Sequence, residues 1–343
     1  MTQDGNPAST PYPLISADDP AAILDVLVSL KVCGSDESIT GVTKAGDGNM
    51  NLVLRVTTDQ RSVIVKQARP WVEKYQEIAA PDERILSEIN FYKCVSAAAD
   101  EVKHAMPTVV ADNPAQRLMV LEDLGAASDY AMLYGSQSGS SDVDPVFEQA
   151  IRWVTKLHAC NVGSDHGIGC QPLLQLNHQH MFSIPLLDPP AIDLDGVCDG
   201  FTKASRALCA DDSIGKAMEQ LGEVYLAGGD ALLHGDYYPG SWLKTESGFR
   251  VIDPEFCFCG PSEFDLGIVA AHWIFCGGEA SAATIDRVCD LSPNEASRNL
   301  IVGFAGSELV RRLVGVAQLP LDADLDQRKA WLDCGTQFLK QFS

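Results

Sequence analysis

The chain has 343 residues, 46% of them hydrophobic, which is enough for one large or two modest domains with substantial cores. Its formal charge of −22 argues against nucleic acid or an anionic membrane as a partner, because both would require clustered Lys and Arg. The N-terminus lacks a basic and apolar targeting region, and no apolar run reaches the roughly 18 residues of a membrane helix, so we expect a cytoplasmic protein.

The N-terminal part of the chain shows tail, helix and strand patterns in turn. Residues 1–16 are rich in Pro, Ser and Thr, which predicts a flexible tail before a helix that ends near Leu30. A period of two then predicts three strands, at 39–44, 51–57 and 62–67. Gly48 and Asn49 lie in the turn between the first two strands, where glycine lets backbone N–H groups approach a phosphate. The same sequence also suits an ordinary turn.

Lys66 ends the third predicted strand in the pattern Val-Ile-Val-Lys, which is typical of the kinase lysine that contacts the α- and β-phosphates of ATP. A helix is predicted over about 82–98, and Glu88 lies on or beside its apolar stripe. An acid in that position needs a partner, so we expect an ion pair between Lys66 and Glu88. A pair with Glu83, or a lysine exposed to solvent, are the alternatives.

Two further strands, predicted at 108–111 and 117–121, precede the polar segment Glu122-Asp123-Leu124-Gly125. A strand that leads into a short polar segment is typical of the hinge of a two-lobed kinase, whose backbone binds adenine. We therefore expect three parts after the tail, an N-lobe over 17–121, a hinge over 122–125 and a helical C-lobe over 126–343. Helical patterns in the C-lobe lie at 145–160, 212–226, 293–318 and 325–342.

The stretch 232–265 interrupts these helices with a predicted hairpin, whose strands span 241–245 and 249–253. A three-residue turn that sets Thr245 opposite Phe249 would place Ser241 opposite Asp253. Asp236 and Glu255 would then share one end of the sheet with them. Carboxylates this close oppose each other's ionisation unless a cation joins them. Because Mg²⁺ binds one or two carboxylates together with nucleotide phosphates, we predict a Mg²⁺ site formed by Asp253, Glu255 and Ser241.

The segment that precedes the hairpin has the spacing of a kinase catalytic loop. His234, Asp236, Pro239 and Ser241 repeat the layout H-x-D-x-x-P-x-N, with Ser in place of Asn. Asp253 follows the next strand, where kinases carry the Asp that binds the metal. Asp265 begins a predicted helix, and we expect its carboxylate to support the loop by accepting hydrogen bonds from it. His234 is expected to be a second supporting residue.

Seven motifs occur in one order over most of the chain. They are GDGNMN at 46–51, VIVKQA at 63–68, LEDL at 121–124, HGDYYPGS at 234–241, VIDPEFCFCGP at 251–261, FDLG at 264–267 and ELVRRLVGVA at 308–317. With them the chain resembles the 5-methylthioribose kinases, a family in the aminoglycoside-phosphotransferase branch of the protein-kinase-like fold. The resemblance implies an α+β fold with two lobes, a small N-lobe built on an antiparallel sheet and a larger, mostly helical C-lobe.

The resemblance also implies an activity and a set of roles. The reaction would be ATP- and Mg²⁺-dependent phosphorylation of a small sugar, at the anomeric hydroxyl of 5-methylthioribose, in methionine salvage. Asp236 would be the base, Asp253 and Glu255 would hold Mg²⁺, and Arg311 or Arg312 would reach the substrate. The implied ATP-binding residues are Gly48, Asn49, Lys66, Glu88, Glu122, Asp123 and Leu124. The family also suggests a homodimer.

Two departures from the family pattern bear on the acceptor. Tyr237-Tyr238-Pro239 replaces Leu-His-Thr beside Asp236, and the region between His272 and Glu308 is shorter. An alternative is therefore a related kinase that acts on another small hydroxyl compound. A second alternative, a nucleotide-binding pseudokinase scaffold, predicts the loss of a catalytic residue, yet the lysine and both aspartates of the motifs are present.

Overall fold

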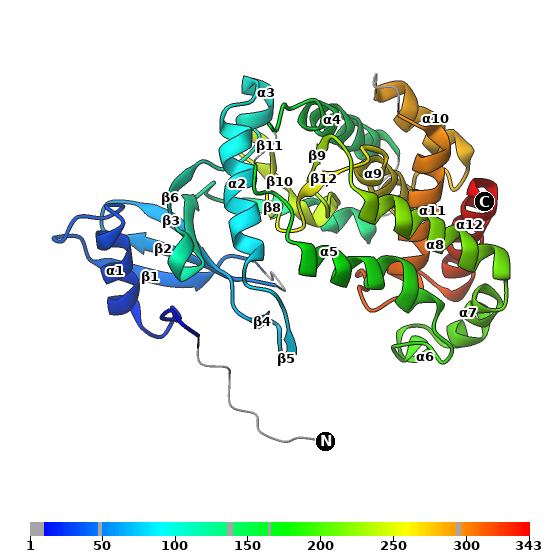
Figure 1. The fold of residues 1–343 in the computed structure, drawn as a ribbon, viewed down its shortest axis with the longest axis horizontal. Coiled ribbons are helices and arrows are strands. Elements are labelled where there is room, and N and C mark those ends of the chain that lie inside the picture. Colours follow the sequence, from blue (N-terminus) through cyan, green and yellow to red (C-terminus); the bar gives the residue numbers. More distant parts are fainter. Residues whose placement is uncertain (1–9, 47–49, 136–139, 164–165, 293–295) are drawn as a thin grey trace. The chain divides into compact units, whose positions relative to one another are not determined.

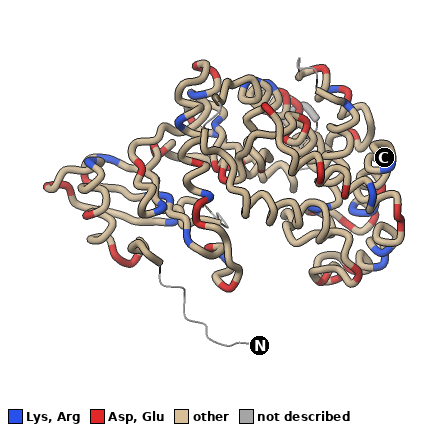
Figure 2. Tube along the Cα trace, viewed as in Figure 1, with Lys and Arg blue, Asp and Glu red and all other residues tan. Residues whose placement is uncertain are grey.

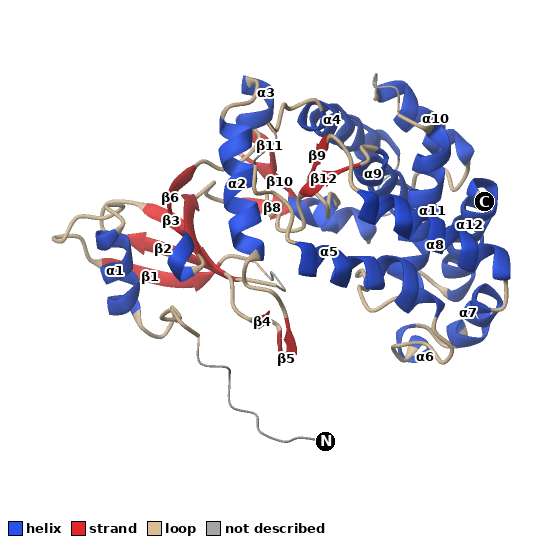
Figure 3. Cartoon of the chain, in the orientation of Figure 1, coloured by secondary structure: helices blue, strands red, loops and turns tan. Residues whose placement is uncertain are grey.

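The computed structural model describes residues 10–46, 50–135, 140–163, 166–292 and 296–343, and these form two units. Residues 1–126 and 164–173 make up the first unit, and residues 127–163 and 174–343 make up the second. The first unit contains an antiparallel sheet with few helices, and the second is mostly helical (Figures 1 and 3). This is the predicted α+β architecture.

The sheet of the first unit has five antiparallel strands in the order β1-β2-β3-β7-β6. Their bounds are Ile39–Lys44, Leu52–Thr58 and Ser62–Gln67 for β1 to β3, and Val109–Asn113 and Leu118–Glu122 for β6 and β7. Alternate residues of β2, beginning with Leu52 and Leu54, are buried, as the period of two requires. They share a core with Ile23 and Leu27 of helix α1, Pro20–Ser29.

Helix α2, Arg84–Ser96, buries a face that includes Glu88. The other elements of this unit are short: β4 (Trp71–Val72), β5 (Tyr75–Ala79), α3 (Asp100–Lys103) and the 3₁₀ turn η1 (Pro114–Gln116). Segment 164–173, which follows the first long helix of the second unit, also belongs here. Gly169 N donates to Ser87 Oγ at 2.7 Å, and Asn90 Nδ2 donates to the carbonyl of Gly167 at 3.0 Å.

The expected flexible tail over residues 1–16 is wrong for its C-terminal part. Tyr12 and Ile15 are buried, with 6% and 4% of their surface exposed. Ile15 N donates to Gln67 Oε1 at 2.9 Å, and Gln67 Nε2 donates to the carbonyl of Pro13 at 3.0 Å. Two hydrogen bonds of Gln67 therefore fasten this segment to the end of β3, although its composition is typical of a tail. Residues 1–9 lie outside the described residues.

Helix α9 lies at the core of the second unit and packs against α11, which in turn packs against α12. Every residue from Phe264 to Phe275 in α9 is buried. A Cβ added at Gly267 would lie 2.6 Å from Phe304 Cβ, so the close approach of α9 and α11 requires glycine there. The helices are α4 (Ser140–His158), α5 (Gln171–His178), α6 (Leu194–Val197), α7 (Phe201–Cys209), α8 (Asp212–Ala227), α9 (Glu263–Phe275), α10 (Ala282–Leu291), α11 (Arg298–Val314) and α12 (Leu325–Phe342).

Short turns and strands complete the second unit. The turns are η2 (Tyr130–Tyr134), η3 (Gln179–Ser183), η4 (Ile184–Leu186) and η5 (Pro239–Ser241). The strands are β8 (Ala127–Asp129), β9 (Ala231–Leu233), β10 (Trp242–Thr245), β11 (Gly248–Val251) and β12 (Phe258–Gly260). β10 pairs with β8 and β11, and β9 pairs with β12, all antiparallel. In the part of the chain that the structure describes, no helix has the length and apolar character needed to cross a membrane.

The predicted hairpin exists, but its register is one residue from the predicted one. Thr245 pairs with Gly248 rather than with Phe249, and the turn therefore has two residues, Glu246 and Ser247. The Thr245 hydroxyl, which donates to the carbonyl of Gly248 at 2.8 Å, closes this tighter turn. Gly248 has φ +108°, in the left-handed region that favours glycine. Ser241 consequently lies opposite Ile252, whose N–H donates to the Ser241 carbonyl at 3.0 Å, and Asp253 follows beyond the pairing.

Acidic residues outnumber basic ones, 47 to 25. Figure 2 shows Asp and Glu along both units rather than in one segment. The acidic residues behind the net charge of −22 are thus spread along the chain and interspersed with Lys and Arg.

Candidate active site

The predicted ion pair in the first unit is confirmed. Lys66 Nζ on β3 lies 2.8 Å from Glu88 Oε1 on α2, and the two residues are 3% and 0% exposed. A buried ammonium group requires a partner of opposite charge, and helix α2 supplies it from the face that packs on the sheet. The pair fixes the lysine at one position on the sheet.

Arg84, one turn before Glu88 on α2, is a second buried charge, and it lies outside the sequence motifs. Its guanidinium is fully buried and donates to Asn51 Oδ1 at 2.9 Å and to the carbonyl of Met50 at 2.6 Å. It also donates to the carbonyls of Arg69 and Pro81, at 2.9 and 2.7 Å. One side chain thus joins the start of β2 to the start of α2. The predicted phosphate-binding residues Gly48 and Asn49 lie directly before Met50, outside the described residues.

The predicted hinge segment follows β7. Glu122 N donates to the carbonyl of Thr108 at 2.9 Å, and Thr108 N donates to Glu122 Oε2 at 3.1 Å. Asp123 accepts from Arg55 Nε at 2.9 Å and from Ser62 Oγ at 2.6 Å. Burial opposes the charge of Asp123, but these hydrogen bonds outweigh it and lower the pKa of its carboxyl group. Both acidic side chains therefore brace the segment, and Leu124 beside them is partly exposed.

In the second unit, the loop after β9 depends on Asp265, as predicted. Asp265 is fully buried and accepts hydrogen bonds from His234 N at 2.8 Å and from Gly235 N at 3.0 Å. His158 Nε2, at the end of α4, lies 3.1 Å from the same carboxylate and was not anticipated. Gly235 has φ +86°, and a Cβ there would lie 2.1 Å from the carbonyl oxygen of Phe256. Only glycine fits this turn.

The side chain of His234 joins the loop to the strand on its far side. Its Nε2 donates to the carbonyl of Ile252 at 2.9 Å, directly before Asp253. Burial lowers the pKa of His234, so the ring is neutral at pH 7 and carries its hydrogen on Nε2. The predicted supporting role of His234 therefore has a specific contact, which joins the loop to the residue before Asp253.

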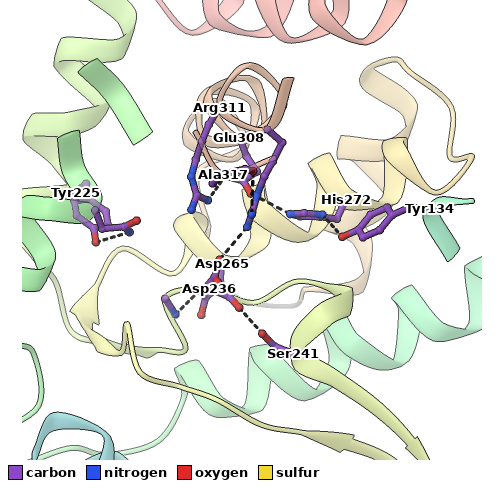
Figure 4. A network of polar contacts seen from close by, with 12 residues as sticks. Tyr134, Tyr225, Asp236, Ser241, Asp265, His272, Glu308, Arg311 and Ala317 are labelled. Atoms are coloured by element: carbon purple, nitrogen blue, oxygen red, sulfur yellow. Dashed lines mark hydrogen bonds and ion pairs between the residues drawn. The ribbon is translucent and has the colours of Figure 1, made fainter. Parts of the chain in front are cut away.

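Asp236 lies at the end of this loop, and its side chain is about 25% exposed. Its Oδ1 accepts from Arg312 Nη2 at 3.0 Å, and its backbone carbonyl accepts from Ser241 Oγ at 2.9 Å (Figure 4). One carboxylate oxygen is thus held by a guanidinium, and the loop backbone is held by a hydroxyl. The arrangement fixes the direction of Asp236 without burying it.

The two predicted substrate arginines have different contacts. Both bond to Glu308, which lies about one turn before them on α11. Glu308 Oε2 accepts from Arg311 Nη1 at 2.8 Å, and Oε1 accepts from Arg312 Nε at 2.6 Å. Only Arg312 reaches Asp236, because neighbouring helix positions point about 100° apart. Burial opposes the charge of Glu308, but the two arginines outweigh it and hold its pKa well below the usual value. The spacing of three and four residues is the signal that could have predicted Glu308 as their partner.

The predicted convergence of three carboxylates is wrong. Among the described residues, no three His, Cys, Asp or Glu side chains are arranged to hold a metal ion. The one-residue change in register sets Ser241 opposite Ile252 rather than Asp253, and the Ser241 hydroxyl donates to the Asp236 carbonyl. Arg312 supplies the positive charge that was expected from a metal at Asp236. Glu255 is buried, with 7% of its surface exposed.

Asp253 still has the features of a Mg²⁺ ligand. It is half-buried with φ +66°, a left-handed conformation that non-glycine residues rarely adopt and that occurs at functional sites. Burial raises the pKa of Tyr238, and the charges of Asp236 and Asp253 raise it further. Both carboxylates are therefore close enough to act on the same side chain. Mg²⁺ usually binds one or two protein carboxylates and takes its other ligands from phosphates and water. The residues present therefore fit such an ion.

The chain is similar to known phosphotransferases over most of its length. A family model described as the phosphotransferase enzyme family matches residues 41–290. The chain belongs to this family. The chain is 27% identical over 331 residues to a methylthioribose kinase of Geobacillus sp. (strain WCH70), covering 82% of this chain and 78% of that one. It is 26% identical over 360 residues to a methylthioribose kinase of Exiguobacterium sibiricum, covering 89% and 87%.

Solved structures of other phosphotransferases share the fold. Choline kinase LicA from Streptococcus pneumoniae superposes with a TM-score of 0.54 at 13% identity, covering 93% of this chain and 97% of that one. An aminoglycoside phosphotransferase from Alicyclobacillus acidocaldarius gives a TM-score of 0.52 at 13% identity, covering 98% and 97%. At these identities the likeness establishes the two-lobed kinase-like fold and no more.

Proposed function

We propose that the chain is an ATP-dependent kinase that phosphorylates the anomeric hydroxyl of 5-methylthioribose. The observation that carries this proposal is the loop at 234–236, in which Asp265 and His234 fix the backbone and Arg312 orients the carboxylate of Asp236. The names of the relatives that match over more than four fifths of the chain support the acceptor. Membership of the phosphotransferase family supports the reaction class.

Phosphoryl transfer needs an aligned nucleophile and compensation of the phosphate charge, with little covalent help from the protein. Asp236 would align the acceptor hydroxyl and accept its proton. Because Arg312 Nη2 occupies Oδ1, the second carboxylate oxygen is the one that would meet the hydroxyl. Arg311, whose charge faces Tyr238, His180 and Tyr225, would meet the sugar or its new phosphate.

The family resemblance implies which residues would bind ATP and Mg²⁺. Lys66, fixed by Glu88, would bind the phosphates, and the backbone of 122–124 would bind adenine. Asp253 would hold Mg²⁺, which supplies positive charge against the phosphates when it is bound. Asp253 suits this role better than Ser241, whose hydroxyl donates within the loop, and Glu255 would be the second carboxylate.

The test is ADP formation from ATP and Mg²⁺ with a panel of acceptors, namely 5-methylthioribose, ribose, choline, homoserine and an aminoglycoside. Turnover specific to 5-methylthioribose is expected. Turnover on another acceptor, with none on 5-methylthioribose, would reject this substrate but keep the assignment as a small-molecule kinase. Tyr238, near Asp236, is one of the positions at which the loop departs from the family motif. ATP binding in a thermal-shift assay without turnover on any acceptor would reject the kinase and favour a scaffold.

A further inference from the structure

A buried chain of polar side chains leads from η2 to Asp236 within the second unit (Figure 4). Tyr134 Oη lies 2.6 Å from His272 Nδ1, and His272 Nε2 lies 3.0 Å from Glu308 Oε1. Glu308 holds Arg312, which in turn holds Asp236. Of the four side chains that precede Asp236, none is more than 6% exposed. The sequence motifs include Glu308 and Arg312 but assign no role to Tyr134 or His272.

Donors and acceptors in this chain have one consistent assignment. Glu308 is ionised between two guanidiniums and can only accept, so His272 Nε2 must carry a hydrogen. Burial, aided by Arg312, lowers the pKa of His272 to about 4, and its ring is therefore neutral at pH 7 with a bare Nδ1. Burial raises the pKa of Tyr134 well above its usual value. Tyr134 thus donates to Nδ1, and His272 donates to Glu308.

One carboxylate oxygen of Glu308 accepts two hydrogen bonds. Oε1 accepts from His272 Nε2 and from Arg312 Nε, whereas Oε2 accepts from Arg311. Two guanidiniums on flexible side-chain stems leave a carboxylate free to turn about its last bond, and the imidazole, held on the buried helix α9, prevents this rotation. Arg312 is therefore presented to Asp236 at a fixed angle.

The ring of Tyr238 completes the frame on the other side of Arg312. The guanidinium carbon lies 4.8 Å from the centre of the Tyr238 ring, and the centres of the Tyr238 and His272 rings are 5.2 Å apart. A guanidinium over an aromatic face is attracted to it. His272 thus touches both groups that define the position of Arg312, its anion and its aromatic support.

We propose that His272, with Tyr134 behind it, is a positioning residue for phosphoryl transfer: it fixes the rotation of Glu308 and thereby the Arg312 guanidinium that aims Asp236. This inference rests on the proposed function, in which Asp236 is the base. A structural role alone would not require this chemistry, because apolar side chains of the same shape can replace a buried polar network at little loss of stability.

Three variants separate positioning from packing. His272→Leu keeps an apolar volume and removes both hydrogen bonds, His272→Gln restores an N–H near Glu308, and Tyr134→Phe removes only one hydroxyl. We expect kcat to fall about 10- to 100-fold in His272→Leu, with KM for ATP unchanged within about twofold, because supporting hydrogen bonds of this kind have that effect. His272→Gln should recover most of the loss. Tyr134→Phe should lie between the wild type and His272→Leu.

Phe275→Leu is the packing control, since Phe275 lies on the same helix with its ring 6.0 Å from that of His272 but outside the polar chain. It should lower the unfolding midpoint and leave kcat near that of the wild type. Equal loss of kcat in Phe275→Leu and His272→Leu would overturn the proposal, as would a His272→Leu enzyme with wild-type kcat or a His272→Gln enzyme no better than His272→Leu.

A readout without turnover distinguishes this inference from the proposed function. In a crystal structure of His272→Leu, we expect Arg312 Nη2 to have left its position 3.0 Å from Asp236 Oδ1. An unchanged Arg312–Asp236 pair in that variant would overturn the inference even if the wild type is an active kinase. Absence of wild-type turnover on every acceptor would instead reject the proposed function, and displacement of Arg312 would still support the positioning contact.

Discussion

Replacement of Asp265 gives a quantitative test of how the catalytic loop is held. Its carboxylate accepts from the buried N–H groups of His234 and Gly235, at 2.8 and 3.0 Å. A hydrogen bond to a charged group contributes about 1.5–3 kcal/mol, so loss of both in Asp265→Ala should reduce the free energy of unfolding by about 3–6 kcal/mol. Asp265→Asn keeps one acceptor oxygen and should lose about half of this.

The measurement is urea unfolding followed by tryptophan fluorescence, which reports mainly on the second unit through Trp153, Trp242, Trp273 and Trp331. Because a whole domain is stable by only about 5–15 kcal/mol, Asp265→Asn is the more informative variant. Ser262→Ala is its control. Ser262 is at the N-cap of the same helix but makes no capping hydrogen bond, so its loss should change stability by less than about 0.5 kcal/mol. An unfolding midpoint of Asp265→Asn equal to that of the wild type would refute the proposed support of the loop.

Three further predictions concern charge. Glu88→Ala removes the carboxylate that pairs with the buried Lys66 ammonium and should cost about 3–5 kcal/mol by thermal or urea unfolding. Glu88→Leu combined with Lys66→Met should restore much of the stability but no ATP turnover. As the pH falls from 6.5 to about 4, the free energy of unfolding of the wild type should decrease by about 3 kcal/mol more than that of His272→Gln. The reason is that folding lowers the pKa of His272, so the neutral ring takes up a proton when the chain unfolds. Equal pH profiles of the two proteins in urea unfolding would contradict this. Chelation of divalent cations should abolish ADP formation, and added Mg²⁺ should restore it. Asp253→Asn should require a higher Mg²⁺ concentration than the wild type. Turnover that survives chelation would contradict the assigned ion.

Local patterns predicted the parts of the site that depend on one or two elements. Lys66 and Glu88 follow from a strand motif and an acid on an apolar helix face, and Asp265 follows from an acid at a helix start after the catalytic loop. The last helix has the predicted bounds, Leu325–Phe342, since its periodicity is uninterrupted. The helix predicted over 293–318 is longer than α11, which begins after its N-cap Ser297 and ends at Val314, before the extended Gly315.

Other features depend on side-chain geometry that spacing does not record. One hydroxyl, that of Thr245, favours a two-residue turn, and the resulting register sets Ser241 opposite Ile252 instead of Asp253. Tyr134 and His272 are 138 positions apart, and His272 and Glu308 are 36 apart, so no periodicity could pair them. A buried histidine on an apolar helix has no distinct signal in one sequence.

Product analysis of wild type and Asp236→Asn with ATP, Mg²⁺ and 5-methylthioribose tests the central claim most directly. Phosphorus NMR should show a sugar 1-phosphate formed by the wild type, and Asp236→Asn should form it about 10²- to 10⁴-fold more slowly while binding ATP equally well. Formation of that product by Asp236→Asn at the wild-type rate would contradict the assignment of Asp236 as the base that the surrounding residues are arranged to aim.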